Sequence, residues 1–123
     1  MRVILYEQEG ATRVHIDATI TGKDDLQVAG HDIGEAPKRW WDHDDYEYIV
    51  TIRKTDKDRL LRALIEDMTS SDEASMRLKT APDKDRLLLD LIQEKFGDDP
   101  LAVSRFRGFV QENKIPYEWF SWP

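Results

Sequence analysis

Three polar residues near the start of the chain, His15, Asp17 and His31, are of the types that bind metals or carry protons. They alternate with apolar residues in two successive extended runs, so all three should share one face of a sheet. If Ile20 pairs with Leu26 across the turn, His15 lies opposite His31; a register two residues away puts Asp17 there instead. Such a set could hold a divalent metal ion or a proton near neutral pH. A solvated strand face is the competing interpretation.

A second candidate follows the pair Trp40-Trp41, where the chain reads Asp42-His43-Asp44-Asp45. Loop carboxylates beside an imidazole bind hard cations or act as general acid and base, which adds His43 and Asp44 to the candidate metal ligands. The spacing matches neither a calcium loop nor a helical His-x-x-x-His pair. A solvated turn that leads into a strand is the alternative.

Aromatic residues gather in two short segments, one beginning at Trp40 and the other at the C-terminus. In a terminal strand, Tyr117 and Trp119 would face one side, and Phe120 and Trp122 the other. One pair can enter the core, while the other needs a cover: the tryptophan loop, a second chain or a ligand. Rings anchor interfaces and carboxylates steer basic partners. We therefore predict a partner-binding surface from Trp40, Trp41, Asp42, Asp44, Asp45, Tyr117, Trp119 and Trp122; a self-covered aromatic cluster is the alternative.

Other kinds of chemistry find no support in the sequence. The chain contains no cysteine, which excludes disulfides, thiol catalysis and cysteine-bound zinc. No serine lies in a Gly-x-Ser-x-Gly context, and the glycines form no phosphate-binding loop. We therefore assign no catalytic residue and no cofactor.

The charge balance constrains the partners. Eighteen Lys and Arg against 25 Asp and Glu give a net charge of −7, which argues against binding to nucleic acid through phosphate contacts. No apolar run approaches the roughly 20 residues of a membrane span, and the N-terminal residues do not read as a signal peptide. We expect a cytoplasmic protein that binds neither membranes nor nucleic acid.

A chain of 123 residues fits one domain, residues 1–123. Period-two alternation predicts that residues 1–53 are mainly strands, near 3–6, 14–20, 26–31 and 46–53. The first of these strands is apolar on both faces, so we expect it in the interior of the sheet. Residues 55–113 are mainly helical, near 56–68, 83–96 and 100–113, and residues 115–122 form a final aromatic strand. A helical turn is expected near Pro37 and a surface loop over 69–82. This predicts an α+β fold, an antiparallel meander of four to five strands with three amphipathic helices on one face.

Two of the expected helices open alike, with Asp-Lys-Asp-Arg-Leu-Leu at Asp56–Leu61 and again at Asp83–Leu88. Convergence on one way to start a helix explains the match as well as duplication does, and we favour convergence. The Asp and Lys residues of both copies are expected to be exposed. The predicted core comprises Val14, Ile16, Ile20, Val28, Tyr48, Val50, Ile52, Leu60, Leu64, Leu88, Leu91, Phe106 and Phe109.

Three segments, Gly30–Gly34, Asp44–Tyr48 and Ile115–Trp122, together resemble a group of small uncharacterised bacterial proteins with no assigned function. The resemblance implies no catalytic residues. In size, acidity and lack of cysteine the chain is also similar to immunity proteins, which inactivate toxins by masking a basic active site.

These observations favour a non-enzymatic protein-binding module, in its most specific form an immunity-type inhibitor. The alternative is a small metal-dependent or His/Asp acid–base hydrolase, and a subunit of a homo-oligomer is a third possibility. The expected partner is a protein, either a basic one or a second copy in a homodimer.

Overall fold

The computed structural model describes residues 1–41, 45–68, 71–80 and 83–122. Five strands pair in chain order as an antiparallel meander that does not close into a barrel: β1 (Arg2–Gln8), β2 (Thr12–Ile20), β3 (Leu26–Gly34), β4 (Asp45–Ile52) and β5 (Glu118–Trp122). The helices of this described part are α1 (Glu35–Trp41), α2 (Lys57–Met68), α3 (Ser71–Thr80), α4 (Lys84–Phe96) and α5 (Ala102–Glu112), with a short 3-10 turn, η1 (Lys54–Asp56). The predicted α+β meander with its aromatic final strand is confirmed.

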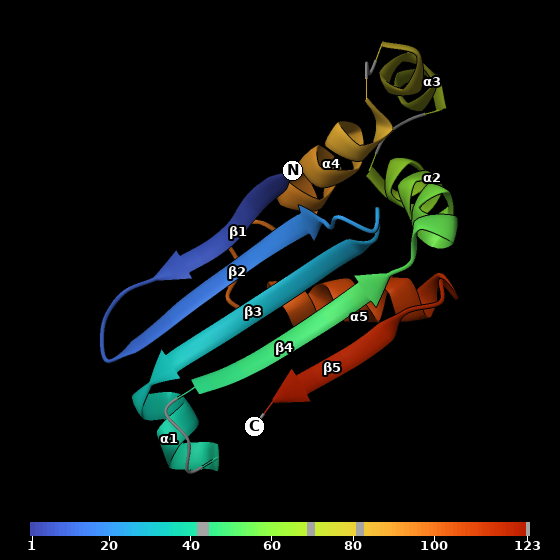
Figure 1. The fold of residues 1–123 in the computed structure, drawn as a ribbon. Helices are drawn as coiled ribbons and strands as arrows, with labels where there is room; N and C mark the ends of the chain where they lie inside the picture. The colour runs from blue at the N-terminus through green and yellow to red at the C-terminus, as the bar shows by residue number, and fades with distance from the viewer. Residues whose placement is uncertain (42–44, 69–70, 81–82, 123) are drawn as a thin grey trace.

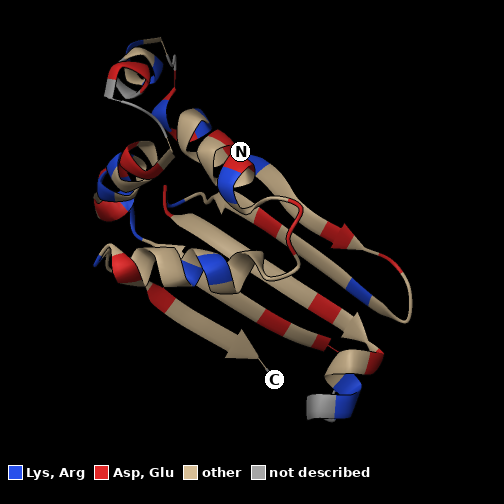
Figure 2. Cartoon of the chain, turned by 180° about the vertical axis from the view of Figure 1, so that it is seen from behind, with Lys and Arg blue, Asp and Glu red and all other residues tan. Residues whose placement is uncertain are grey.

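Helices α4 and α5 cover one face of the sheet, and no described helix lies over the other (Figures 1 and 2). On the covered face, α4 contacts β1 and β2, and α5 contacts β3 and β4, while α2 packs against α4. The short helix α1 joins β3 to β4 at one end of the sheet (Figure 1). We call the uncovered side of the sheet the open face.

The core lies between the sheet and the helices, because alternate strand residues meet the apolar stripes of α2, α4 and α5. The ring of Phe96 packs edge-on against Phe106 and Phe109, which joins α4 to α5. Most of the predicted core residues are buried. Val14, Ile20 and Tyr48 are only partly buried and pack against this core.

The segment 69–82, expected to be a loop, contains helix α3 instead. Its first turn carries Asp72 and Glu73 and its last turn Arg77 and Lys79, the charge order that suits the helix dipole. Arg77 also pairs with Glu94 of α4 at 3.0 Å. Periodicity did not indicate this helix, because its larger apolar side chains, Met76 and Leu78, are exposed rather than aligned in a buried stripe.

The first strand, expected in the interior of the sheet, is an edge strand. Val3 and Leu5 are buried, but Ile4 between them is 43% exposed. An irregularity in pairing between Ile4 and Tyr6 turns the rest of the strand, so its apolar residues do not fill both faces. Among the described residues, no helix is both long and apolar enough to cross a lipid bilayer.

Candidate functional site

The two histidines of the open face lie opposite each other. Ile20 pairs with Leu26 and His15 with His31, as the first of the two predicted registers requires. The same row continues from Glu7 on β1 through both histidines to Glu47 on β4 and ends at Trp122 on β5. The prediction that His15, Asp17 and His31 share one face is therefore confirmed.

The neighbouring row of the open face is more apolar. It runs from Ile4 through Asp17, Ala29 and Ile49 to Phe120. Because Ala29 is the smallest side chain in the row, the surface is hollowed there. The hollow, of about 230 Å³, is lined by Ala29, Gly30, Ile49, the two histidines, Asp17 and Glu47.

Carboxylates surround both histidine rings. His15 Nδ1 lies 3.2 Å from Glu7 Oε1, and His15 Nε2 lies 3.0 Å from Asp17 Oδ2. His31 Nε2 lies 3.6 Å from Asp45 and 3.8 Å from Glu47, beyond hydrogen-bond distance, and has no hydrogen-bond partner. The centre of the open face therefore concentrates negative charge and holds His15 in a fixed orientation.

The structure does not gather the three described candidate ligands, His15, Asp17 and His31, into a metal site. Both ring nitrogens of His15 already face carboxylates, Nδ1 that of Glu7 and Nε2 that of Asp17. Within the described ranges, no group of three or more His, Asp or Glu side chains is placed to hold a metal ion. His43 and Asp44 lie outside those ranges, so metal binding there stays a prediction.

The terminal strand β5 is the most exposed strand of the sheet, with all five residues accessible. Trp119 pairs with Val50 and faces the helix side, whereas Phe120 and Trp122 face the open side, as the alternation predicts. Phe120 is 52% and Trp122 45% exposed. Large rings therefore border the acidic centre of the open face.

The predicted partner-binding residues divide between the two faces. Trp122 and Asp45 belong to the open face, whereas Tyr117 and Trp119 lie on the helix side, where Tyr117 packs against the core. Trp40 and Trp41 are the last two residues of α1, and the structure does not describe their side chains. Asp42 and Asp44 lie outside the described residues as well.

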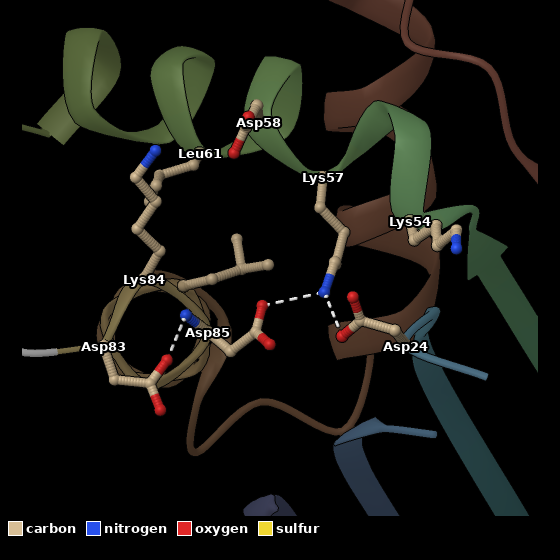
Figure 3. A pocket seen from close by; sticks show the side chains of 9 residues that line it. Asp24, Lys54, Lys57, Asp58, Leu61, Asp83, Lys84 and Asp85 are labelled. Carbon is tan, nitrogen blue, oxygen red and sulfur yellow. Dashed lines mark hydrogen bonds and ion pairs between the residues drawn. The ribbon is translucent and has the colours of Figure 1, made fainter. Parts of the chain in front are cut away.

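The expected exposure of Lys57 is wrong. This lysine is buried, and its Nζ donates to Asp24 Oδ1 at 2.7 Å and to Asp85 Oδ1 at 2.8 Å (Figure 3). Burial opposes its charge, but the two carboxylates outweigh burial and raise the pKa of Lys57, while Lys57 lowers the pKa of Asp24. The contact links the β2–β3 turn to α2 and α4. No local pattern indicates it, because both partners are distant in sequence.

Asp56 and Asp85 are also less exposed than expected, whereas Asp58, Asp83 and Lys84 are exposed. Asp83 accepts from the backbone N–H groups of Asp85 and Arg86 and caps α4. The cavity beside this cluster (Figure 3) holds aspartates and lysines in close mixture. Of these charges, Lys57 with Asp24 and Asp85 connects the two helices to the β2–β3 turn.

A cleft on the helix side was not predicted. We call it the α5 cleft; its volume is about 290 Å³ and it is lined by Asp32, Tyr46, Tyr48, Pro100, Leu101, Val103, Ser104, Arg107 and Trp119. The Tyr48 hydroxyl donates to Asp32 Oδ1 at 2.6 Å. The Tyr48 ring lies over Gly30, where a Cβ would come within 2.1 Å of it. Strand pairing brings Asp32 opposite Tyr46 and Gly30 opposite Tyr48.

Comparison of the chain with protein-family models, with curated proteins and with solved structures found no match.

Proposed function

We propose that this protein is a non-enzymatic binding module that docks a basic protein on its open face. The observation that carries the proposal is an uncovered sheet face with exposed aromatic rings beside carboxylates that surround two histidines. Helices α4 and α5 bury one side of the sheet, and nothing in the described chain covers the other.

Charge favours a foreign partner over a second copy. Around the histidines stand four carboxylates, those of Glu7, Asp17, Asp45 and Glu47. Two basic side chains lie beside them: Arg2, 3.6 Å from Asp17, and Arg13, which lines a pocket with both histidines. A two-fold dimer through this face would set the same patch against itself and oppose like charges. A basic surface would instead be attracted and oriented by it.

The apolar part of the surface supplies the anchors. Phe120 and Ile49 are paired neighbours beside the hollow over Ala29, and Trp122 ends the next row. Aromatic rings within a polar rim are the usual centre of a protein interface. No further described strand pairs with β5, so its outer edge can also add a strand from the partner.

In its most specific form, the module inhibits an enzyme by covering a basic active site. The absence of cysteine supports a place in a reducing cytoplasm. The outcomes below distinguish a foreign basic partner from a homodimer.

The test begins with immobilised wild-type chain, used to capture proteins from a lysate of the source cells. Each captured protein is identified, purified and titrated by calorimetry against three chains: wild type, Phe120→Asp, and the control Met76→Asp. Met76 is 66% exposed on α3, well away from β5. We expect a basic partner with one-to-one stoichiometry, weakened about tenfold or more by Phe120→Asp and unchanged by Met76→Asp.

A second pair of variants tests charge. Glu47→Lys on the open face should weaken the same complex, whereas Glu112→Lys, exposed at the end of α5, should not. A partner that binds all variants equally, or sedimentation showing that the chain pairs only with itself, contradicts the proposal.

A further inference from the structure

Arg107 of α5 occupies an unusual position for a cation in an acidic chain. Its guanidinium carbon lies 4.2 Å from the centre of the Trp119 ring, and its Nε donates to the Tyr117 hydroxyl at 3.3 Å. Both partners are neutral. Arg107 is therefore held by an aromatic ring and a hydroxyl rather than by an ion pair.

The other basic side chains of the described residues fall into two groups. Lys57 and Arg77 are buried or partly buried, and each has a carboxylate partner. The remaining lysines and arginines are exposed. Within the part of the chain that the structure describes, Arg107 is the one partly buried lysine or arginine without a carboxylate partner. An anion placed beside it would complete a charge pair that the protein leaves open.

The groups around Arg107 narrow the chemistry of that anion. The α5 cleft sets Tyr46, Tyr48 and Trp119 beside Arg107, with apolar contact from Leu101 and Val103. Aromatic walls favour a flat ring, and the fork of a guanidinium matches a carboxylate. The volume of about 290 Å³ lies at the small end of ligand sites.

We propose that the α5 cleft binds a small aromatic carboxylate, with its carboxylate on Arg107 and its ring among Tyr46, Tyr48 and Trp119. This site lies on the helix side of the sheet, and is independent of the open face.

Asp32 supplies the second polar contact of the cleft. Tyr48 donates to Oδ1, which leaves Oδ2 to accept from a hydroxyl or amine on the ligand ring. Burial raises the pKa of Asp32, although the hydrogen bond from Tyr48 partly offsets this effect. Burial and the neighbouring Asp32 also raise the pKa of Tyr48, so its hydroxyl remains a donor. Aromatic carboxylates that carry a ring donor should bind more tightly than those without one.

Arg107 is oriented before any ligand arrives. Stacking on Trp119 and the bond to Tyr117 restrict its side chain, and Gln111 Nε2 holds the same hydroxyl at 2.7 Å. The hydrogen bond from Arg107 lowers the pKa of Tyr117. Restricting the side chain in advance reduces the entropy lost when a ligand binds.

The test is an NMR titration of ¹⁵N-labelled protein with three probes of similar size: phenylacetate, phenethylamine and cyclohexylacetate. The reporters are the Arg107 Nε–H and Trp119 indole N–H signals. We expect saturable shifts with phenylacetate in the low millimolar range or below. Phenethylamine, which lacks the carboxylate, and cyclohexylacetate, which lacks the aromatic ring, should each bind about tenfold more weakly or worse.

Two variants assign the site. Arg107→Gln should abolish saturable phenylacetate binding. The control Arg105→Gln should leave it unchanged, because Arg105 lies two residues earlier on the same helix, on a different side, and is paired with Asp99. The comparison of probes on wild-type protein needs no variant, so it stands if Arg107→Gln fails to fold. Absence of saturable shifts with phenylacetate up to its solubility limit, equal binding of phenylacetate and phenethylamine, or equal binding by both variants overturns the proposal.

Discussion

Ala18, Val28 and Val50 pair across three neighbouring strands on the helix-covered face, and each is fully buried. On the open face, His15, His31 and Glu47 pair across the same strands and remain accessible to solvent. The backbone of the two faces is shared, so the difference arises from what covers them. The covered face stabilises the fold, while the open face is the surface to which we assign recognition of a partner. Substitutions on the two faces should therefore affect different properties.

The largest expected effect is on the covered face. Leu91→Ala removes a fully buried side chain of α4 and should lower the free energy of unfolding by about 2–5 kcal/mol. Phe120→Ala on the open face should change it by no more than about 0.5 kcal/mol. Urea denaturation of both variants measures the contrast. Equal losses would mean that the open face is as well packed as the core.

The next effect separates the two copies of the repeated helix start. Lys57→Met leaves Asp85 without its buried cation and should cost about 1–3 kcal/mol of unfolding free energy. Lys84→Met, at the matching but exposed position, should cost less than about 0.5 kcal/mol. The same urea experiment measures both. A similar cost for the two lysines would refute the structural role of the Lys57 cluster.

The strands and amphipathic helices were predictable because their signals are local. Alternation over β2 and β3 predicted that His15, Asp17 and His31 share one face, although it left two registers open, and the leucine stripes predicted α2 and α4. The cluster at Lys57 was not predictable, because Asp24 and Asp85 approach it only through tertiary contacts, and Lys84 has the same neighbours in sequence. The α5 cleft was not predictable for the same reason, because Trp119 approaches Arg107 only when the C-terminal strand pairs with β4. Helix α3 was not predicted, because it lacks a buried apolar stripe.

The pH dependence of stability should show the Lys57 cluster directly. The pKa of Lys57 is raised above its ordinary value of 10.5, so its contribution is complete below that pH and is lost as the pH rises through the folded-state pKa. The pKa of Asp24 is lowered from 3.8, so its contribution is lost as the pH falls below that value. The difference in unfolding free energy between wild type and Lys57→Met should therefore be constant near neutral pH and narrow at both extremes. A difference that stays constant across both limits would contradict this account of the ion pairs.

The smallest expected effect concerns metal at the histidines. Both ring nitrogens of His15 already face carboxylates. Among the described residues, His31 does not form a group of three potential metal ligands with His15 and Asp17. Titration with Zn²⁺ to millimolar concentration should therefore leave the imidazole signals of both residues in place. Saturable shifts of both signals would instead support the metal-dependent alternative.

The central claim, that the open face docks a basic protein, is tested most directly by mapping the complex. Amide signals of ¹⁵N-labelled chain are followed while the purified partner is added, at low and at high salt. We predict the largest changes in β5 and in β2–β4 around Glu47 and Asp17, with affinity that falls as salt rises. Changes confined to α2, α3 and α4, or affinity independent of salt, would contradict the account.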